Sequence, residues 1–313
     1  MRQASSGKRP AGWGERTKCV APIWLLMTTV SVLSAGCGTG RQAQWDAPVL
    51  AGKVTAPAAG DASGAAAEAA WAERGDKTAL LRAIAAWEAQ VAANPGDGAT
   101  LARLARAYYF LADGHLRVLG PKNPEYLGAF EKGTAAGERA LAALSPAFKD
   151  KVTHDEKVED AIKVVGKEGL AAMYWYAANL GKWSRAKGIA ALLGNKDRVK
   201  GVIERVEALD ETFFHGAPHR YFGVYWALLP VGRDLDKSRS HFERSLAIAP
   251  SYVGTKVLMA ESYAVKKQDK ALFARLLAEV QATPDDILPD LVPETRSEKQ
   301  KARELGAKAD ELF

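Results

Sequence analysis

Apolar positions recur with a helical period along most of the chain. From residue 67 to the C-terminus, segments rich in Ala, Leu, Arg and Glu alternate with short stops of Gly, Pro, Asn or Asp. Apolar residues three and four positions apart share one face of a helix, and the alternating pattern of strands is almost absent. The pattern therefore predicts an all-α body over residues 67–313.

A 34-residue period within this body indicates helical hairpins of the tetratricopeptide type. Pro250 and Pro284 lie 34 residues apart, where the second helix of such a unit ends, and Pro95 fits the same position near the other end of the body. Small residues let paired helices approach and large ones fill the gap to the next pair. The corresponding small and large positions are Ala83, Trp87, Leu101, Leu104, Ala105, Tyr108, Ser238, Phe242, Ser245, Met259, Ala260 and Tyr263.

The 34-residue register breaks in the middle of the chain, where the intervals between predicted helix ends exceed 34 residues. We predict insertions at 114–125 and 216–230 that lengthen helices or add loops, and a hairpin turn at 195–197. The fold expected from these intervals is an irregular, tetratricopeptide-like α-solenoid of four to five hairpins.

The N-terminal 36 residues have the pattern of a lipoprotein signal peptide. A basic stretch, residues 2–18, is followed by an apolar run, residues 20–33, which is shorter than the ~20 residues that span a bilayer. Leu33-Ser34-Ala35-Gly36 then precedes Cys37 and resembles the bacterial lipobox, although Leu33 lies one place further from the cysteine than usual. We predict cleavage after residue 36 and a lipid on Cys37; the alternative is an ordinary thiol at this position.

Residues 37–66 are dominated by Gly, Ala, Thr, Gln and Pro, without a sustained apolar period. This composition predicts a flexible tether that, as a random coil, spans roughly 30 Å. Gly38 rather than Asp follows the cysteine, which by resemblance to enterobacterial sorting signals favours the outer membrane. The predicted location is therefore periplasm-facing and lipid-anchored, with the outer membrane favoured over the inner membrane.

Net charge excludes nucleic acid as the expected partner. Of the formal charge of +6, +4 belongs to residues 1–36, so the remainder of the chain is almost neutral. Binding to a phosphate backbone needs clustered Lys and Arg that release counterions. Of the two cysteines, Cys19 lies in the leader, so no disulfide within the mature chain is expected.

Motifs of catalysis are scarce. Ser184-x-x-Lys187 has a nucleophile spacing, but the partner motifs of serine acyltransferases are missing. His215 and His219 are four apart and could share a helix face as metal ligands, but Gly216 and Pro218 favour a loop or helix start and a third ligand is not apparent. We predict no enzyme activity, no cofactor and no metal site.

Two aromatic clusters, residues 173–183 and 213–226, carry more ring surface than one helical seam buries. Three explanations stand open: central helices buried on several sides, an apolar groove or pore, or contact with another subunit. In the groove hypothesis Asn179, Lys182 and Arg220 are polar markers at the rim. The candidate groove residues are Tyr174, Trp175, Asn179, Lys182, Trp183, His219, Arg220, Tyr221, Tyr225 and Trp226.

These segments carry a family resemblance. The body, from about residue 70 to residue 313, resembles the TRAP transporter T-component (TatT) family of tetratricopeptide-like periplasmic lipoproteins. The matching segments are 170–183, 213–230, 241–250, 255–263, 272–280, 284–289 (PDDILP) and 309–313 (ADELF). Ala217 departs from the family pattern, where a second Gly commonly follows His215-Gly216.

The resemblance implies a homotrimer that docks the substrate-binding protein of a tripartite ATP-independent periplasmic transporter and does not itself catalyse a reaction. An aromatic groove would then pass a small apolar or organic ligand to or from that binding protein. The alternative hypothesis is a lipoprotein scaffold of the same architecture that holds envelope-assembly partners without binding a ligand.

Overall fold

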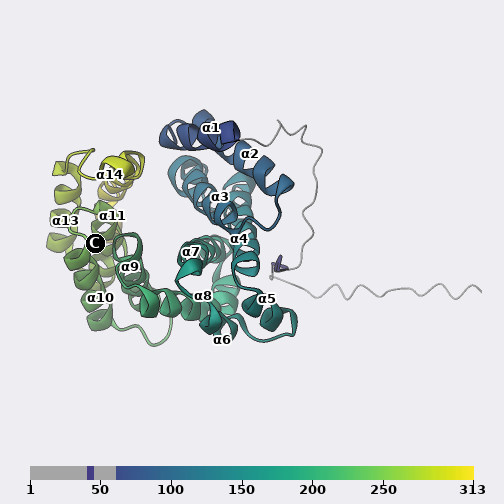
Figure 1. The fold of residues 1–313 in the computed structure, drawn as a ribbon. Helices are drawn as coiled ribbons and strands as arrows, with labels where there is room; N and C mark the ends of the chain where they lie inside the picture. The colour runs from purple at the N-terminus through teal and green to yellow at the C-terminus, as the bar shows by residue number, and fades with distance from the viewer. Residues whose placement is uncertain (1–40, 46–60) are drawn as a thin grey trace, which may run out of the picture. The chain divides into compact units, whose positions relative to one another are not determined.

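The computed structural model describes residues 41–45 and 61–313, and these ranges are drawn in colour in Figure 1. Helices dominate the described part of the chain, which contains no strand, so the all-α prediction is confirmed. Cys37 and the signal peptide fall outside the described residues. None of the described helices combines the length and apolar character needed to cross a membrane.

The N-terminal half contains α1 (Asp61–Ala72), α2 (Lys77–Ala93), α3 (Gly98–Phe110), η1 (Leu111–Leu116), η2 (Arg117–Leu119), α4 (Pro124–Leu144), α5 (Pro146–Thr153), α6 (Val158–Ala161), η3 (Ile162–Val164) and η4 (Lys167–Gly169). The remainder contains α7 (Leu170–Lys187), α8 (Ile189–Leu209), α9 (Phe213–Leu228), α10 (Leu235–Ile248), α11 (Val253–Leu258), η5 (Met259–Ala264), α12 (Val265–Lys267), α13 (Lys270–Ala282), η6 (Pro289–Leu291), α14 (Val292–Gly306) and α15 (Ala309–Leu312). The first helix thus begins six residues before the boundary expected at residue 67.

Many helices begin at a side chain that caps them. A carboxylate, amide or hydroxyl oxygen accepts a hydrogen bond from a backbone N–H of the first turn, which would otherwise lack a partner. The capping residues are Asp76, Asp97, Asn123, Ser145, Asp234 and Asp269. Short polar residues between apolar stretches therefore determine where these helices start.

The repeat positions identified in the sequence are buried. Pro95, Pro250 and Pro284 each follow the end of a helix, namely α2, α10 and α13. The small and large consensus residues around them are at most 6% exposed. Helices close in sequence pack closely, as in α1 with α2, α3 with α4, α7 with α8 and α9 with α10. The curved solenoid itself remains a prediction.

One predicted interruption is wrong. Residues 195–197 lie inside α8, where the Asn195 side-chain amide donates to the Ala191 carbonyl one turn earlier, so its polar group is satisfied within the helix. The insertion at 216–230 takes the helical form of its two expected forms, since most of it lies in α9 and the non-helical backbone is confined to Phe214–Gly216. The insertion at 114–125 is irregular as expected, with π and 3₁₀ turns before α4.

Buried apolar side chains form two clusters. The first extends from Ala67 to Phe222 and includes α2, α3, α4, α7 and α8, and the second extends from Phe242 to Ala302. α9 contacts both, since Phe222 belongs to the first cluster and Val224 packs against the second. α9 is therefore the helix through which the two clusters meet.

Residues 41–45 pack against the helical body. Arg41 donates two hydrogen bonds to the fully buried Glu138 of α4, and the Gln44 backbone N–H donates to the same carboxylate at 2.9 Å. The Trp45 ring lies edge-on to Phe148, with centroids 5.3 Å apart. Within the predicted tether, Arg41, Gln44 and Trp45 thus have specific partners on the body.

Candidate ligand-binding cavity

A cavity of about 450 Å³ lies among α7, α8 and α9, with further contributions from Tyr109 of α3 and Leu258 of α11. Each of the three main helices presents one stripe to it, with residues spaced three or four apart. On α9 the stripe is Ala217, Arg220, Tyr221, Val224, Tyr225 and Leu228. Such spacing places side chains on one face of a helix. The volume is within the range of small-molecule sites.

The wall of this cavity is mainly apolar and aromatic. α7 contributes small residues, including Ala178 and Gly181, and these leave the space open. α8 contributes aliphatic side chains, and Leu193 at its first turns is 50% exposed, so the cavity reaches the surface there. The four phenol rings are Tyr109, Tyr174, Tyr221 and Tyr225.

Every charged side chain in the lining is a cation. The set comprises Lys182, Arg185, Lys196, Arg220, Arg233 and Lys266, with no Asp or Glu among the described lining residues. Lys182 and Arg185 have carboxylate partners outside the lining, Asp113 and Glu261. For Arg233 and Lys266 the described part of the chain offers no carboxylate within salt-bridge distance. The cavity therefore combines apolar walls with positive charge.

A second, smaller cavity of about 90 Å³ adjoins the first. The two share Tyr109, Tyr174, Lys182, Arg220 and Leu258 as lining residues. The smaller one continues toward α14 and is more polar, since it also contains acidic side chains. A ligand in the larger cavity would consequently lie next to a charged region.

Asp113 is the centre of that charged region. Its carboxylate, 6% exposed, accepts from Lys182 Nζ at 2.8 Å and from Lys301 Nζ of α14. Burial alone would raise the pKa of Asp113, but the two ammonium groups lower it well below its ordinary value. Asp113 in turn raises the pKa of Lys182 against the opposing effect of burial. The three groups remain charged and join α7 and α14 to η1, the turn that follows α3.

The beginning of α9 is a turn in an unusual backbone conformation. Phe214, His215 and Gly216 have φ of 42°, 61° and 71°, in the left-handed region that side chains disfavour. The buried Arg220 guanidinium donates to the carbonyls of Phe214 and His215 and lies 4.1 Å from the Tyr252 ring centroid. Arg220 thereby holds the turn in place while its side chain also lines the cavity.

The structure brings together five of the candidate groove residues. Tyr174, Lys182, Arg220, Tyr221 and Tyr225 line the larger cavity. Of these, Arg220 is 3% exposed, so it lies in the interior and not at a rim.

The other candidates occupy other helix faces. Asn179 is fully buried and donates to the carbonyls of Ala105 and Trp175, and Trp175 borders only the smaller cavity. Trp183 is 3% exposed in the core. Trp226 and His219 also lie outside the linings of both cavities. Among adjacent aromatic residues, ring type alone does not reveal which face a side chain occupies.

Sequence reasoning missed the contribution of α8 and the outlying cations. Leu192, Val199 and Ile203 form the cavity stripe of α8. The signal for them was a shared apolar helix face, since these residues lie seven and four positions apart. Arg233 and Lys266 had no such signal, since they reach the cavity from segments that only the fold brings near.

The motifs set aside in the sequence have structural partners. Ser184 accepts from the Asn195 amide at 3.1 Å, whereas the Lys187 ammonium lies 5.6 Å from the Trp183 ring centroid. The His215 ring stacks on Tyr252 with centroids 5.2 Å apart, away from any shared helix face with His219. Ser184, Lys187 and His215 thus each have a contact within the helical body.

Comparison with known proteins adds an independent finding. A family model described as TRAP transporter T-component matches residues 128–313. This range includes all of α7, α8 and α9, and therefore the three stripes of the larger cavity. No curated protein matches the chain.

Proposed function

Because the chain belongs to the TRAP transporter T-component family, we propose that it is an accessory subunit of such a transporter and binds the transported ligand in the cavity among α7, α8 and α9. The observation that carries this proposal is the lining: an apolar space of about 450 Å³ whose charged groups are all cations. Apolar walls with a few oriented polar groups are typical of small-molecule sites.

The ligand that fits this lining has an apolar body and an anionic group. The apolar part would lie against Tyr221, Tyr225 and the aliphatic stripe of α8. The anionic group would meet Arg233 or Lys266, the two lining cations without a carboxylate partner among the described residues. Phenol groups of the lining can donate hydrogen bonds, because burial raises the pKa of Tyr221 and keeps it neutral.

The oligomeric state, the anchor and the partner that we propose follow from the family. In this proposal a homotrimer of the chain, held at the periplasmic side of a membrane by a lipid on Cys37, docks the substrate-binding protein of the transporter and exchanges the ligand with it. The outer membrane is the favoured location. The cavity serves passage of the ligand and not its conversion.

A blocking variant tests the cavity. Gly181 lines it, and a Cβ there would meet only Val199 Cγ1, at 3.8 Å, so the side chain of Gly181→Leu would extend into the space. The probe is 8-anilinonaphthalene-1-sulfonate, which has an apolar body and an anionic group, followed by fluorescence and displaced by decanoate or 1-decanol. We expect binding of the probe to fall at least about tenfold in Gly181→Leu, a difference of about 1.4 kcal/mol.

The matched control is Gly128→Leu on α4, where a Cβ meets no atom within 4 Å. We expect it to bind the probe as the unchanged protein does. Arg233→Gln should weaken the binding of decanoate more than the binding of 1-decanol, because only decanoate carries a negative charge that can pair with Arg233. Equal probe binding by Gly181→Leu and the unchanged protein would show that the ligand does not use this cavity.

Capture experiments test the partner and the anchor. From solubilised membranes, the chain should retain a TRAP-type substrate-binding protein, and Cys37→Ser should abolish sedimentation with membranes. Recovery of envelope-assembly proteins alone would favour the scaffold hypothesis. A Cys37→Ser variant that still sediments with membranes would contradict the lipid anchor.

A further inference from the structure

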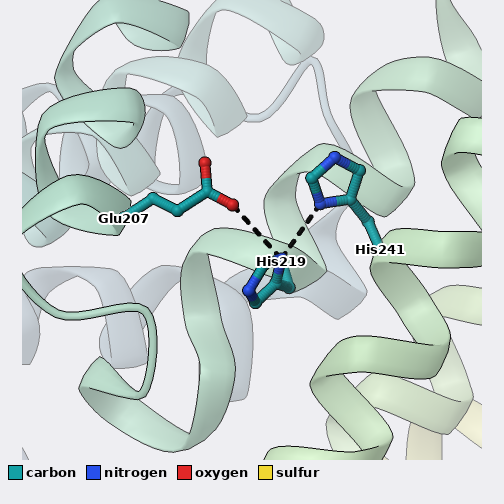
Figure 2. Close-up of side chains that lie close together, drawn as sticks. All are labelled: Glu207, His219 and His241. Carbon is teal, nitrogen blue, oxygen red and sulfur yellow. Dashed lines mark hydrogen bonds and ion pairs between the residues drawn. The ribbon is translucent and has the colours of Figure 1, made fainter.

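A cluster of two imidazoles and a carboxylate lies where α8, α9 and α10 meet. His219 Nδ1 is 3.0 Å from His241 Nδ1 and 3.3 Å from a carboxylate oxygen of Glu207 (Figure 2). Each of these residues comes from a different helix, and their potential ligand atoms all lie within 4.8 Å of one another. The sequence analysis considered His219 as a metal ligand only with His215, since Glu207 and His241 lie 12 and 22 residues away along the chain.

The hydrogen bonds of His219 determine which of its two ring nitrogens presents a lone pair to the cluster. Its Nε2 lies 2.9 Å from the Glu211 carboxylate, and a carboxylate only accepts hydrogen bonds. In the neutral ring Nε2 therefore carries the hydrogen and Nδ1 is unprotonated. Arg244 donates to the same carboxylate, from Nε at 3.1 Å, and holds it in place.

With His219 in this neutral form, three electron-pair donors converge at one point. If His241 Nδ1 donates to His219 Nδ1, the Glu207 oxygen still faces a lone pair at 3.3 Å. His219 is 7% exposed, so water does not readily offset this repulsion. A positive ion among the three atoms would satisfy all of them.

The spacing suits a tetrahedral metal ion. Zn–N and Zn–O bonds of about 2.0–2.1 Å separate neighbouring ligand atoms by about 3.3 Å. The His219–His241 and His219–Glu207 distances of 3.0 and 3.3 Å are close to this separation. The Glu207 side chain is 30% exposed and has freedom to approach His241.

We propose that Glu207, His219 and His241 bind one Zn²⁺ ion that joins α8, α9 and α10 beside the ligand cavity. Two imidazole nitrogens and one carboxylate oxygen form a donor set typical of Zn²⁺, with a fourth position for water. Glu211 is a positioning residue, because it orients the His219 ring and does not touch the metal. The ion would link α8 and α10 through α9, where the two apolar clusters meet.

Titration with Zn²⁺ tests the site in the purified, untagged chain after removal of metals by a chelator. We expect one Zn²⁺ per chain by calorimetry and a rise in the melting temperature on addition of Zn²⁺. His241→Ala should weaken binding at least about 100-fold and abolish the rise. Glu207→Gln, which preserves side-chain shape on another helix, should also weaken binding at least about tenfold.

Two further variants separate a metal site from a structural cluster. His154→Ala removes an exposed imidazole, 77% exposed, and should leave Zn²⁺ binding unchanged. Glu211→Gln should lower affinity by about 10- to 100-fold with the stoichiometry still at one. The same titration with Co²⁺ should give visible bands of tetrahedral nitrogen and oxygen ligation, without the near-ultraviolet band of a thiolate ligand.

Circular dichroism of each metal-free variant shows whether it is folded. A folded His241→Ala variant that binds Zn²⁺ as tightly as the unchanged protein would overturn the proposal. So would an unchanged protein that binds no Zn²⁺, or a Co²⁺ spectrum with thiolate ligation, because a cysteine and not this cluster would then hold the metal.

Discussion

At the scale of single residues, α9 contains residues that stabilise its backbone and also determine how the cavity is lined. Gly216 has φ of +71° in the turn before the cavity stripe. Arg220, one turn later, donates hydrogen bonds to the Phe214 and His215 carbonyls of this turn. The position of Tyr221 and Tyr225 in the cavity therefore depends on a glycine and an arginine that do not themselves need to contact a ligand.

Gly216→Ala should destabilise the protein by about 1–2 kcal/mol. Alanine is energetically disfavoured in the left-handed conformation, and its Cβ would lie 3.3 Å from the Ser245 backbone. Urea unfolding measures the free energy. As a comparison, Gly128→Ala on α4 has open space around the new Cβ and should raise stability by up to about 1 kcal/mol. Equal effects of the two substitutions would contradict the importance of the turn.

Residue types alone did not separate cavity residues from core residues. Tyr225 lines the cavity while its neighbour Trp226 does not, and Trp226 instead has the Lys237 ammonium 4.5 Å from its ring centroid. Adjacent residues on a helix point about 100° apart, so both rings satisfy the same sequence pattern. The distinction requires knowledge of which neighbouring helix covers which face.

At the scale of helices, α14 is tied to the centre of the fold by charge. Lys301 of α14 and Lys182 of α7 both bind Asp113, beyond the end of α3. Arg74 and Arg106 also bind Glu294 of α14. Near the end of the chain, α14 is therefore paired with side chains 188 residues or more earlier in the sequence, at Arg74, Arg106 and Asp113.

Asp113→Asn should destabilise the protein by about 3 kcal/mol, because it leaves two largely buried ammonium groups without their carboxylate. This expected loss is at the lower end of the range for broken buried ion pairs, since the Lys182 side chain is still 32% exposed and water can stabilise its charge. Chemical unfolding at neutral pH measures the change. Asp310→Asn, which removes the partner of the exposed Lys270, should change stability by less than about 1 kcal/mol.

The same carboxylate predicts a dependence on pH. The folded-state pKa of Asp113 is depressed, so its stabilisation is fully present above the unfolded pKa of about 3.9 and is lost as pH falls toward the folded value. Between pH 5 and the acid limit, the unchanged protein should lose more unfolding free energy than Asp113→Asn. Parallel curves for the two proteins would contradict this assignment.

At the scale of the whole molecule, residues 41–45 lie close in sequence to Cys37 and on the surface of the helical body. The buried Arg41–Glu138 pair joins this segment to α4, and Trp45 joins it to α5 and α7 through Phe148 and Tyr176. If Cys37 carries lipid, the body lies nearer to the membrane than a free tether of this length would place it.

Arg41→Ala should release this segment and lower stability by about 3 kcal/mol, because Glu138 loses its bidentate partner while buried. Burial raises the pKa of Glu138 against the effect of Arg41, so the unpaired carboxyl would take up a proton more readily. Limited proteolysis should cut the variant near residue 45 faster than the unchanged protein. The exposed pair Arg239–Glu243 offers a control, since Arg239→Ala should leave the free energy of unfolding almost unchanged.

The sequence by itself determined the helical class, the capped helix starts and the buried repeat positions around Pro95, Pro250 and Pro284. These properties are local, because a periodicity of three to four residues and a polar capping residue act within one or two turns. The family was also recognisable, since its motifs are contiguous segments.

Only the tertiary structure decided which faces of α7, α8 and α9 enclose space, which cations reach that space, and that Glu207, His219 and His241 meet. Each of these depends on contacts between helices that are distant in sequence. The packing of large and small side chains determines how such helices meet. The periodicity of one helix describes its own apolar face but not the neighbour that covers it, so cavity and cluster emerge only when the helices are assembled.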